Sequence, residues 1–80
     1  MEKDKFVILR PLDSKPYYVR SVEILSETEH MVSYTPLLRH AKRHYTKEAA
    51  EAEAKLARGA AEVITLAEAE EREAARRGNG

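Results

Sequence analysis

The chain has 80 residues, the length of a single domain, so a second folded domain within it is excluded. It contains no cysteine, which excludes disulfides and thiolate zinc sites. Its 14 lysines and arginines balance its 14 aspartates and glutamates, which argues against an overall polycation for nucleic acid and against an overall polyanion that mimics DNA.

Two segments near the N-terminus predict a β-hairpin. Residues 6–9 (FVIL) form a short apolar run with a β-branched centre, which is typical of a strand buried on both faces. Residues 11–16 have proline at each end and turn formers between, which predicts a loop. Residues 17–25 are rich in β-forming side chains and predict the second strand. At strand period, one face of this strand would carry Tyr18, Arg20, Val22 and Ile24.

A third strand and a short helix are expected next. After a polar break at residues 26–29, residues 31–34 (MVSY) predict a weaker strand. Thr35 and Pro36 then favour a helix start, because threonine can cap the first amides and proline fits the first helical position. The inward-facing residues of this helix would be Leu37, Leu38 and Ala41.

The clearest predicted element is an alanine-rich helix that begins at Thr46 and runs to about Arg58. Thr46 is the expected N-cap, and Glu48 lies in the first turn, where the helix dipole favours it. A narrow inward stripe would consist of Ala49, Ala52 and Leu56. The outward face would carry Lys47, Glu51, Lys55 and Arg58.

Two interpretations compete after this helix. In the first, Gly59 stops the helix in a left-handed conformation, and residues 63–66 (VITL) return as a strand. In the second, one long helix continues, and its seam would comprise Ala49, Ala52, Leu56, Gly59, Val63 and Leu66. The first is preferred because an internal glycine costs a helix about 1 kcal/mol and the Val-Ile-Thr cluster favours strand.

Residues 66–77 predict a final, weakly anchored helix. Thr65 and Glu68 have capping-box spacing, and the expected ion pairs are Glu68 with Arg72 and Glu73 with Arg77. Residues 78–80 are expected to be disordered. The predicted fold is α+β, a small antiparallel ββ(β)αβ sheet with one alanine-rich helix packed on it, in a domain of residues 1–66 followed by a charged helix and tail of residues 67–80. A thin core is expected from Phe6, Val7, Ile8, Leu9, Tyr18, Val22, Ile24, Leu56, Val63 and Ile64.

Metal binding and catalysis find little support in the sequence. His40 and His44 have the spacing at which two imidazoles share a helix face, but a metal site needs a third ligand, and the neighbouring Lys42 and Arg43 would repel a cation. The C-terminal glutamates lie on a solvated helix without the unequal environments that acid–base catalysis requires. We therefore expect neither a metal nor a cofactor, and no enzymatic activity.

Two oppositely charged segments are the candidate binding surfaces. The basic one comprises Arg39, His40, Lys42, Arg43, His44 and Tyr45, a mixture of cations and aromatics that can contact phosphates and unpaired bases. The acidic one is the C-terminal helix, with Glu68 and Glu71 as candidate contacts. A charged outer face on a short helix explains the basic residues equally well and is the preferred interpretation over a nucleic-acid site.

The segment AKRHYTKEAAEA, residues 41–52, preceded by hairpin-like strands and followed by Gly59, resembles the layout of very small phage-encoded accessory proteins. The resemblance covers about residues 6–66 and implies a protein that acts by binding, in a class that includes anti-CRISPR and other anti-defence inhibitors. The expected partner is then a protein or ribonucleoprotein, with direct DNA or RNA binding through residues 39–45 as the alternative. Self-association is also expected, because an edge strand and a small-residue helix face are open to pairing.

The expected location is the cytoplasm, which would be that of the host cell if the protein is phage-encoded. Residues 1–5 (MEKDK) lack the apolar core of a signal peptide. No later run approaches the roughly 20 apolar residues of a membrane span. We therefore expect neither secretion nor a membrane partner.

Overall fold

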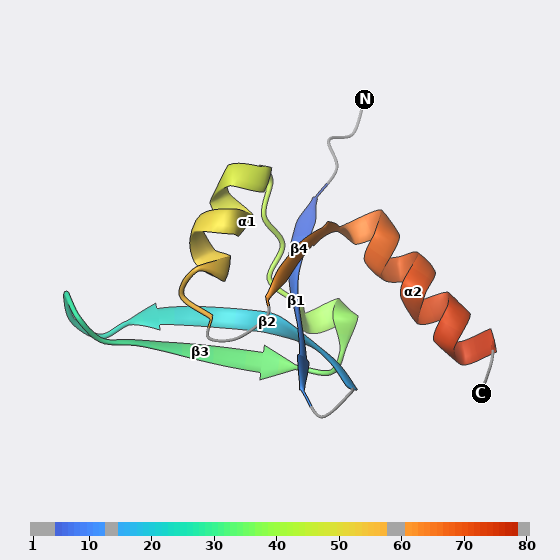
Figure 1. Ribbon diagram of the computed structural model, residues 1–80, viewed down its shortest axis with the longest axis horizontal. Helices are drawn as coiled ribbons and strands as arrows, with labels where there is room; N and C mark the ends of the chain where they lie inside the picture. The colour runs from blue at the N-terminus through green and yellow to red at the C-terminus, as the bar shows by residue number, and fades with distance from the viewer. Residues whose placement is uncertain (1–4, 13–14, 58–60, 79–80) are drawn as a thin grey trace.

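A computed structural model describes residues 5–12, 15–57 and 61–78 and confirms the α+β prediction. Four antiparallel strands form one open sheet with the order β3-β2-β1-β4, and two helices and a short 3₁₀ helix pack around it (Figure 1). The elements in chain order are β1 (Phe6–Leu12), β2 (Lys15–Ile24), β3 (His30–Thr35), η1 (Leu38–His40), α1 (Lys47–Ala54), β4 (Glu62–Thr65) and α2 (Leu66–Gly78).

The first hairpin is longer than the sequence predicts. The strands continue through most of the expected loop of residues 11–16, with Pro11 opposite Pro16 and Leu12 opposite Lys15, while residues 13–14 lie outside the described part. Proline lacks a backbone donor and weakens a ladder. Placing both prolines at one register position near the hairpin end confines that weakness to a single rung.

A β-bulge in β2 overturns the predicted face of that strand. Val19 pairs with Tyr34 and Ser21 pairs with Ser33, so Arg20 is an extra residue that shifts the alternation. Val22 consequently packs with the cluster that contains Val19, whereas Tyr18 belongs to the cluster on the opposite face. The prediction that side chains alternate strictly along this strand, with Tyr18, Arg20, Val22 and Ile24 on one face, is therefore wrong.

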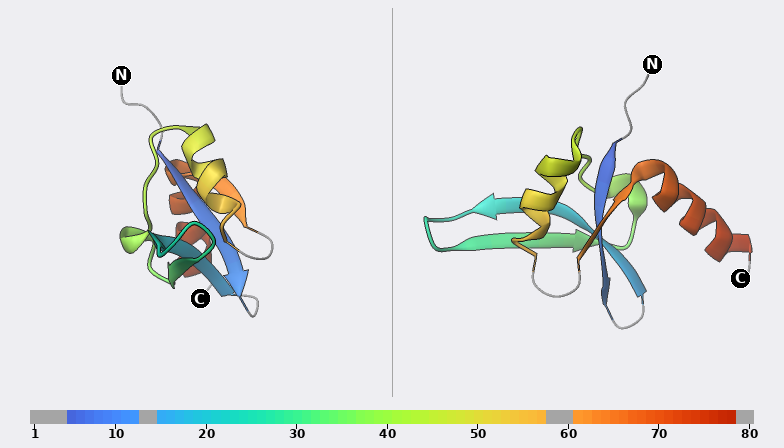
Figure 2. Two further views of the ribbon diagram at one scale, coloured as in Figure 1. Left: turned by 90° about the vertical axis from the view of Figure 1, so that its left-hand side faces the viewer. Right: turned by 45° about the horizontal axis from the view of Figure 1, so that its top comes forward.

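The core consists of two small clusters on the two faces of the sheet (Figure 2). One face, covered by α2 and the segment around η1, buries Val7, Leu9, Tyr18, Ala41, Ile64 and Ala69. The other face, covered by α1, buries Ile8, Val19, Ala50 and Ala57. Most of the predicted core residues are buried or partly buried, but Ile24 is 64% exposed, because it lies where the β2–β3 hairpin has extended beyond the helices.

Helix α1 begins where predicted and ends early. Thr46 is the N-cap, and its Oγ1 accepts a hydrogen bond of 3.1 Å from the Ala49 amide. The helix ends at Ala54, and β4 follows, so the long-helix alternative is wrong. The predicted helix end at residues 58–59 lies outside the described part.

The buried face of α1 differs from the predicted stripe. Ala50 is fully buried, whereas Ala49 and Ala52 are exposed. Alanines occupy positions 49, 50, 52, 54 and 57, so hydrophobicity alone cannot select between neighbouring stripes. The outward Lys47, Glu51 and Lys55 are exposed as predicted.

The helix expected after Thr35 is reduced to one 3₁₀ turn. Ala41 is already extended, with φ −66° and ψ 138°, and the Lys42 amide donates a 2.9 Å hydrogen bond to the Val19 carbonyl. This bond returns the chain to the sheet before an α-helix can develop. Leu38 and Ala41 face inward as predicted, but Leu37 is 41% exposed.

Helix α2 begins as predicted, with the Thr65 hydroxyl accepting a 3.1 Å hydrogen bond from the Glu68 amide. Glu68 forms the expected ion pair with Arg72 at 3.4 Å. Glu73 pairs with Arg76, and the side chain of Arg77, its expected partner, lies outside the described part. Ala69 is fully buried against the sheet, so α2 contributes directly to the core.

Candidate interaction groove

A groove of about 340 Å³ lies between helix α2 and residues 36–43, which contain η1 and which we call the η1 segment. Its apolar lining comes from both sides, because Leu37 and Leu38 belong to the η1 segment and Leu66 begins α2. Arg39 and Arg43 line the η1 side, and Glu70 and Glu73 line the α2 side. Pro36 and Ala74 are the other lining residues among those that the structure describes. We call this surface the η1–α2 groove.

Backbone and side-chain hydrogen bonds position the arginine side of the groove. The Leu37 amide donates a 3.1 Å bond to the Thr35 hydroxyl, which fixes the exit from β3. Half-buried Leu38 then packs on the core, and Arg39 points into solvent from the same turn. The bond from the Lys42 amide to the sheet fixes the far end of the segment.

The acidic side is held by a contact between α2 and the core tyrosine. The Tyr18 hydroxyl donates a 3.0 Å hydrogen bond to Glu73 Oε1, and Arg76 donates to both Glu73 and the Tyr18 hydroxyl. Burial raises the pKa of Tyr18, so its hydroxyl stays protonated and remains a donor at neutral pH. Glu73 is thereby committed to this network, whereas Glu70 is exposed and forms no ion pair with any other side chain that the structure describes.

Only two of the predicted site residues line the groove. Arg39 and Arg43 do so, while His40 is exposed in η1 outside it. Lys42 is paired with Glu53 of α1, at 2.8 and 3.0 Å from its two carboxylate oxygens. Tyr45 is 71% exposed elsewhere, with Lys5 Nζ 5.8 Å from its ring centre.

The acidic candidates also differ from the groove residues. Glu68 is engaged with Arg72, Glu71 is exposed, and neither lines the groove. Sequence reasoning missed Leu66, Glu70 and Ala74, although their spacing of four residues places them on one face of a helix. This four-residue spacing could have identified the groove side of the helix, whereas the high density of glutamate could not.

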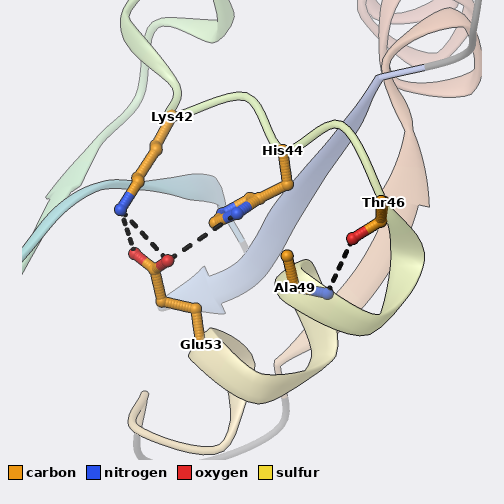
Figure 3. A network of polar contacts seen from close by, with 5 residues as sticks. All are labelled: Lys42, His44, Thr46, Ala49 and Glu53. Carbon is orange, nitrogen blue, oxygen red and sulfur yellow. Dashed lines mark hydrogen bonds and ion pairs between the residues drawn. The ribbon is translucent and has the colours of Figure 1, made fainter.

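His44 has a structural position that the sequence did not reveal. Its backbone forms two 2.8 Å hydrogen bonds with Phe6 at the N-terminal end of β1, and its side chain is buried with residue exposure of 6% (Figure 3). Nδ1 lies 3.7 Å from Glu53 Oε2, and buried Nε2 has no hydrogen-bond partner within the described structure. Burial lowers the pKa of His44, which keeps the imidazole neutral at neutral pH.

The expected shared helix face of His40 and His44 is therefore wrong, since a 3₁₀ turn and an extended segment separate them. Over residues 5–12, 15–57 and 61–78, no group of three or more histidine, aspartate or glutamate side chains could hold a metal ion. In the same ranges, no helix is both long enough and apolar enough to cross a membrane.

Comparisons with models of known protein families, with curated proteins and with solved structures find no match. Nothing among them links the chain to the phage-encoded accessory proteins that its layout resembles. The functional argument therefore depends on the geometry of the η1–α2 groove.

Proposed function

We propose that the chain is a non-enzymatic protein-binding module that recognises a partner through the η1–α2 groove. The observation that carries this proposal is the juxtaposition of apolar side chains, two exposed arginines and exposed Glu70 in one groove, contributed by two separately anchored elements. Arginine and apolar anchors are the groups that dominate protein interfaces. Inhibition of a host defence complex, which the layout resemblance implies, would be one form of this activity.

The charges favour a protein partner over nucleic acid. A phosphate backbone needs a continuous cationic surface, but Lys42 is neutralised by Glu53 and His44 is buried in its neutral form. Of the cations predicted in this segment, Arg39 and Arg43 line the groove, and Glu70 lines its other side. A partner that presents both signs of charge around an apolar segment fits this arrangement better than a uniform polyanion does.

Affinity capture with matched variants tests the proposal. A tagged chain is used as bait, and captured proteins are quantified for the wild type, for Arg39→Ala with Arg43→Ala, and for Lys47→Ala with Lys55→Ala. The control pair removes the same charge from the exposed face of α1. Two interface arginines at about 1 kcal/mol or more each predict at least a tenfold loss of the captured partner for the groove variant alone. Equal retention by both variants would contradict the proposal.

A nucleic-acid titration distinguishes protein binding from the alternative, direct binding of DNA or RNA. Fluorescence anisotropy with random single- and double-stranded oligonucleotides is expected to show no binding that depends on Arg39 and Arg43. Binding with a steep salt dependence that the Arg39→Ala and Arg43→Ala variant abolishes would instead assign these residues to phosphate recognition.

A further inference from the structure

The tip of the β2–β3 hairpin carries three exposed apolar side chains. Ile24 is 64% exposed, Leu25 52% and Met31 54%, and the tip lies at one end of the longest axis of the molecule (Figure 1). Exposed apolar side chains at a turn do not stabilise the fold, and this chain has few large apolar residues outside its thin core. We call residues 23–31 the prong.

The prong is pre-organised and apolar on both faces. Ile24 pairs with His30 and Met31 pairs with Glu23, so Ile24 and Met31 lie on opposite faces of the hairpin. The Leu25 and Ser26 amides donate to the Glu29 carbonyl at 3.0 and 3.1 Å. Ser26 Oγ accepts bonds from the amides of Thr28 and Glu29. A fixed projection of this shape fits into a groove better than onto a flat surface, and its rigidity lowers the entropy cost of binding.

The prong is also acidic. Residues 21–38 contain no lysine or arginine but include Glu23, Glu27 and Glu29, all of which are exposed. An anionic lipid surface would repel such a tip, whereas an apolar groove with arginines along one side would attract it. The complementary surface is therefore apolar and cationic.

The η1–α2 groove of the same chain has these properties. Exposed Leu37 lines it, together with Arg39 and Arg43 on the same side. The tip of the β2–β3 hairpin points away from η1 and lies at the opposite end of the molecule from α2, so the prong of one copy cannot reach its own groove (Figures 1 and 2). We propose that the prong of one copy docks into the η1–α2 groove of a second copy. Because Glu70 lines the opposite side, the prong glutamates turn toward the arginines, which defines one orientation.

This contact is heterologous, so it builds open chains or rings rather than an isologous dimer. Three apolar side chains and a few exposed ion pairs bury far less surface than the roughly 800 Å² that each partner buries in a stable complex. The association is accordingly weak, with a dissociation constant on the order of 100 μM. The inference rests on the groove being the binding surface of the proposed function, and a bound partner would displace the second copy.

Analytical ultracentrifugation of the full chain, from about 10 μM to about 1 mM, tests the proposal. The weight-average mass is expected to rise above the monomer value with concentration and to fall back in high salt. A prong variant, Ile24→Ser with Leu25→Ser, and a groove variant, Arg39→Glu with Arg43→Glu, should each remain monomeric. All four side chains are exposed, so both variants should fold. A control, Lys47→Glu with Lys55→Glu, should assemble as the wild type does.

Mixing the two defective variants gives the sharpest result. The prong variant retains a groove and the groove variant retains a prong, so an equimolar mixture should form dimers and nothing larger. A monomeric wild type at 1 mM, assembly by either variant alone, or a mixture that stays monomeric would overturn the inference. So would binding of the monomer to phosphatidylcholine vesicles that the prong variant loses, because it would assign the prong to lipid.

The two proposals fail separately. If the wild type stays monomeric while partner capture still requires Arg39 and Arg43, the docking of a second copy is wrong and the proposed function stands. If the chain assembles as described but capture does not depend on these arginines, the groove serves self-association alone.

Discussion

Replacing His44 with phenylalanine should stabilise the protein, most strongly at acidic pH. The imidazole is buried, its Nε2 has no partner in the described structure, and its Nδ1 is 3.7 Å from Glu53 Oε2, which is too far for a good hydrogen bond. An unsatisfied buried polar atom costs about 1–3 kcal/mol. Phenylalanine removes that atom and retains a flat ring, so we expect a gain of about 1 kcal/mol at pH 7.5.

The pH dependence follows from the lowered pKa of His44, which arises mainly from burial, with Lys42 acting in the same direction and Glu53 opposing it. The unfolded chain takes up a proton near pH 6.5, while the folded chain resists it until the lower, folded pKa. Stability is therefore full above pH 6.5 and falls between the two pKa values by up to about 1.4 kcal/mol per pH unit. His44→Phe should remove this loss.

Urea denaturation at pH 7.5 and pH 5.5 measures the effect. Other groups also titrate between these values, so His44→Phe is compared with His40→Phe, which changes an exposed imidazole. The His44 variant should show a smaller drop in unfolding free energy than the wild type, and the His40 variant should follow the wild type. An equal drop in all three proteins, or a clear destabilisation by His44→Phe at pH 7.5, would refute the reasoning.

Two further substitutions test the packing of the helices. Tyr18→Phe should lower the unfolding free energy by about 1–2 kcal/mol, because it deletes the hydroxyl that bonds Glu73 and Arg76, and urea denaturation that shows no change would contradict this anchor for α2. Ala50→Leu should cost about 1–3 kcal/mol by overpacking, whereas Ala52→Leu on the exposed side should be nearly neutral in thermal denaturation. A larger loss of stability from Ala52→Leu than from Ala50→Leu would instead favour the predicted stripe of Ala49, Ala52 and Leu56.

Local signals in the sequence predicted the element types well. The apolar run at residues 6–9 lies in β1, and the threonines at positions 46 and 65 cap their helices through bonds to the third residue beyond. These features depend on side chains a few residues apart, so a single sequence carries them.

Features that depend on tertiary contacts were not predictable. The bulge at Arg20 reverses the side-chain alternation of β2 without any glycine or proline to mark it. The buried position of His44 requires the chain to return beside Phe6, which is 38 positions away. The η1–α2 groove joins two segments that the sequence presented as separate charged surfaces, and only the fold places Arg39 and Glu70 along the same groove.

Site-specific photo-crosslinking tests the role of the groove most directly. A photoreactive phenylalanine analogue would replace either Leu37, exposed in the groove, or Tyr45, exposed outside it, in a chain used at micromolar concentration in lysate. The account predicts a covalent adduct with a partner protein from position 37 and none from position 45. An adduct from position 45 alone would contradict the assignment of the η1–α2 groove as the binding surface.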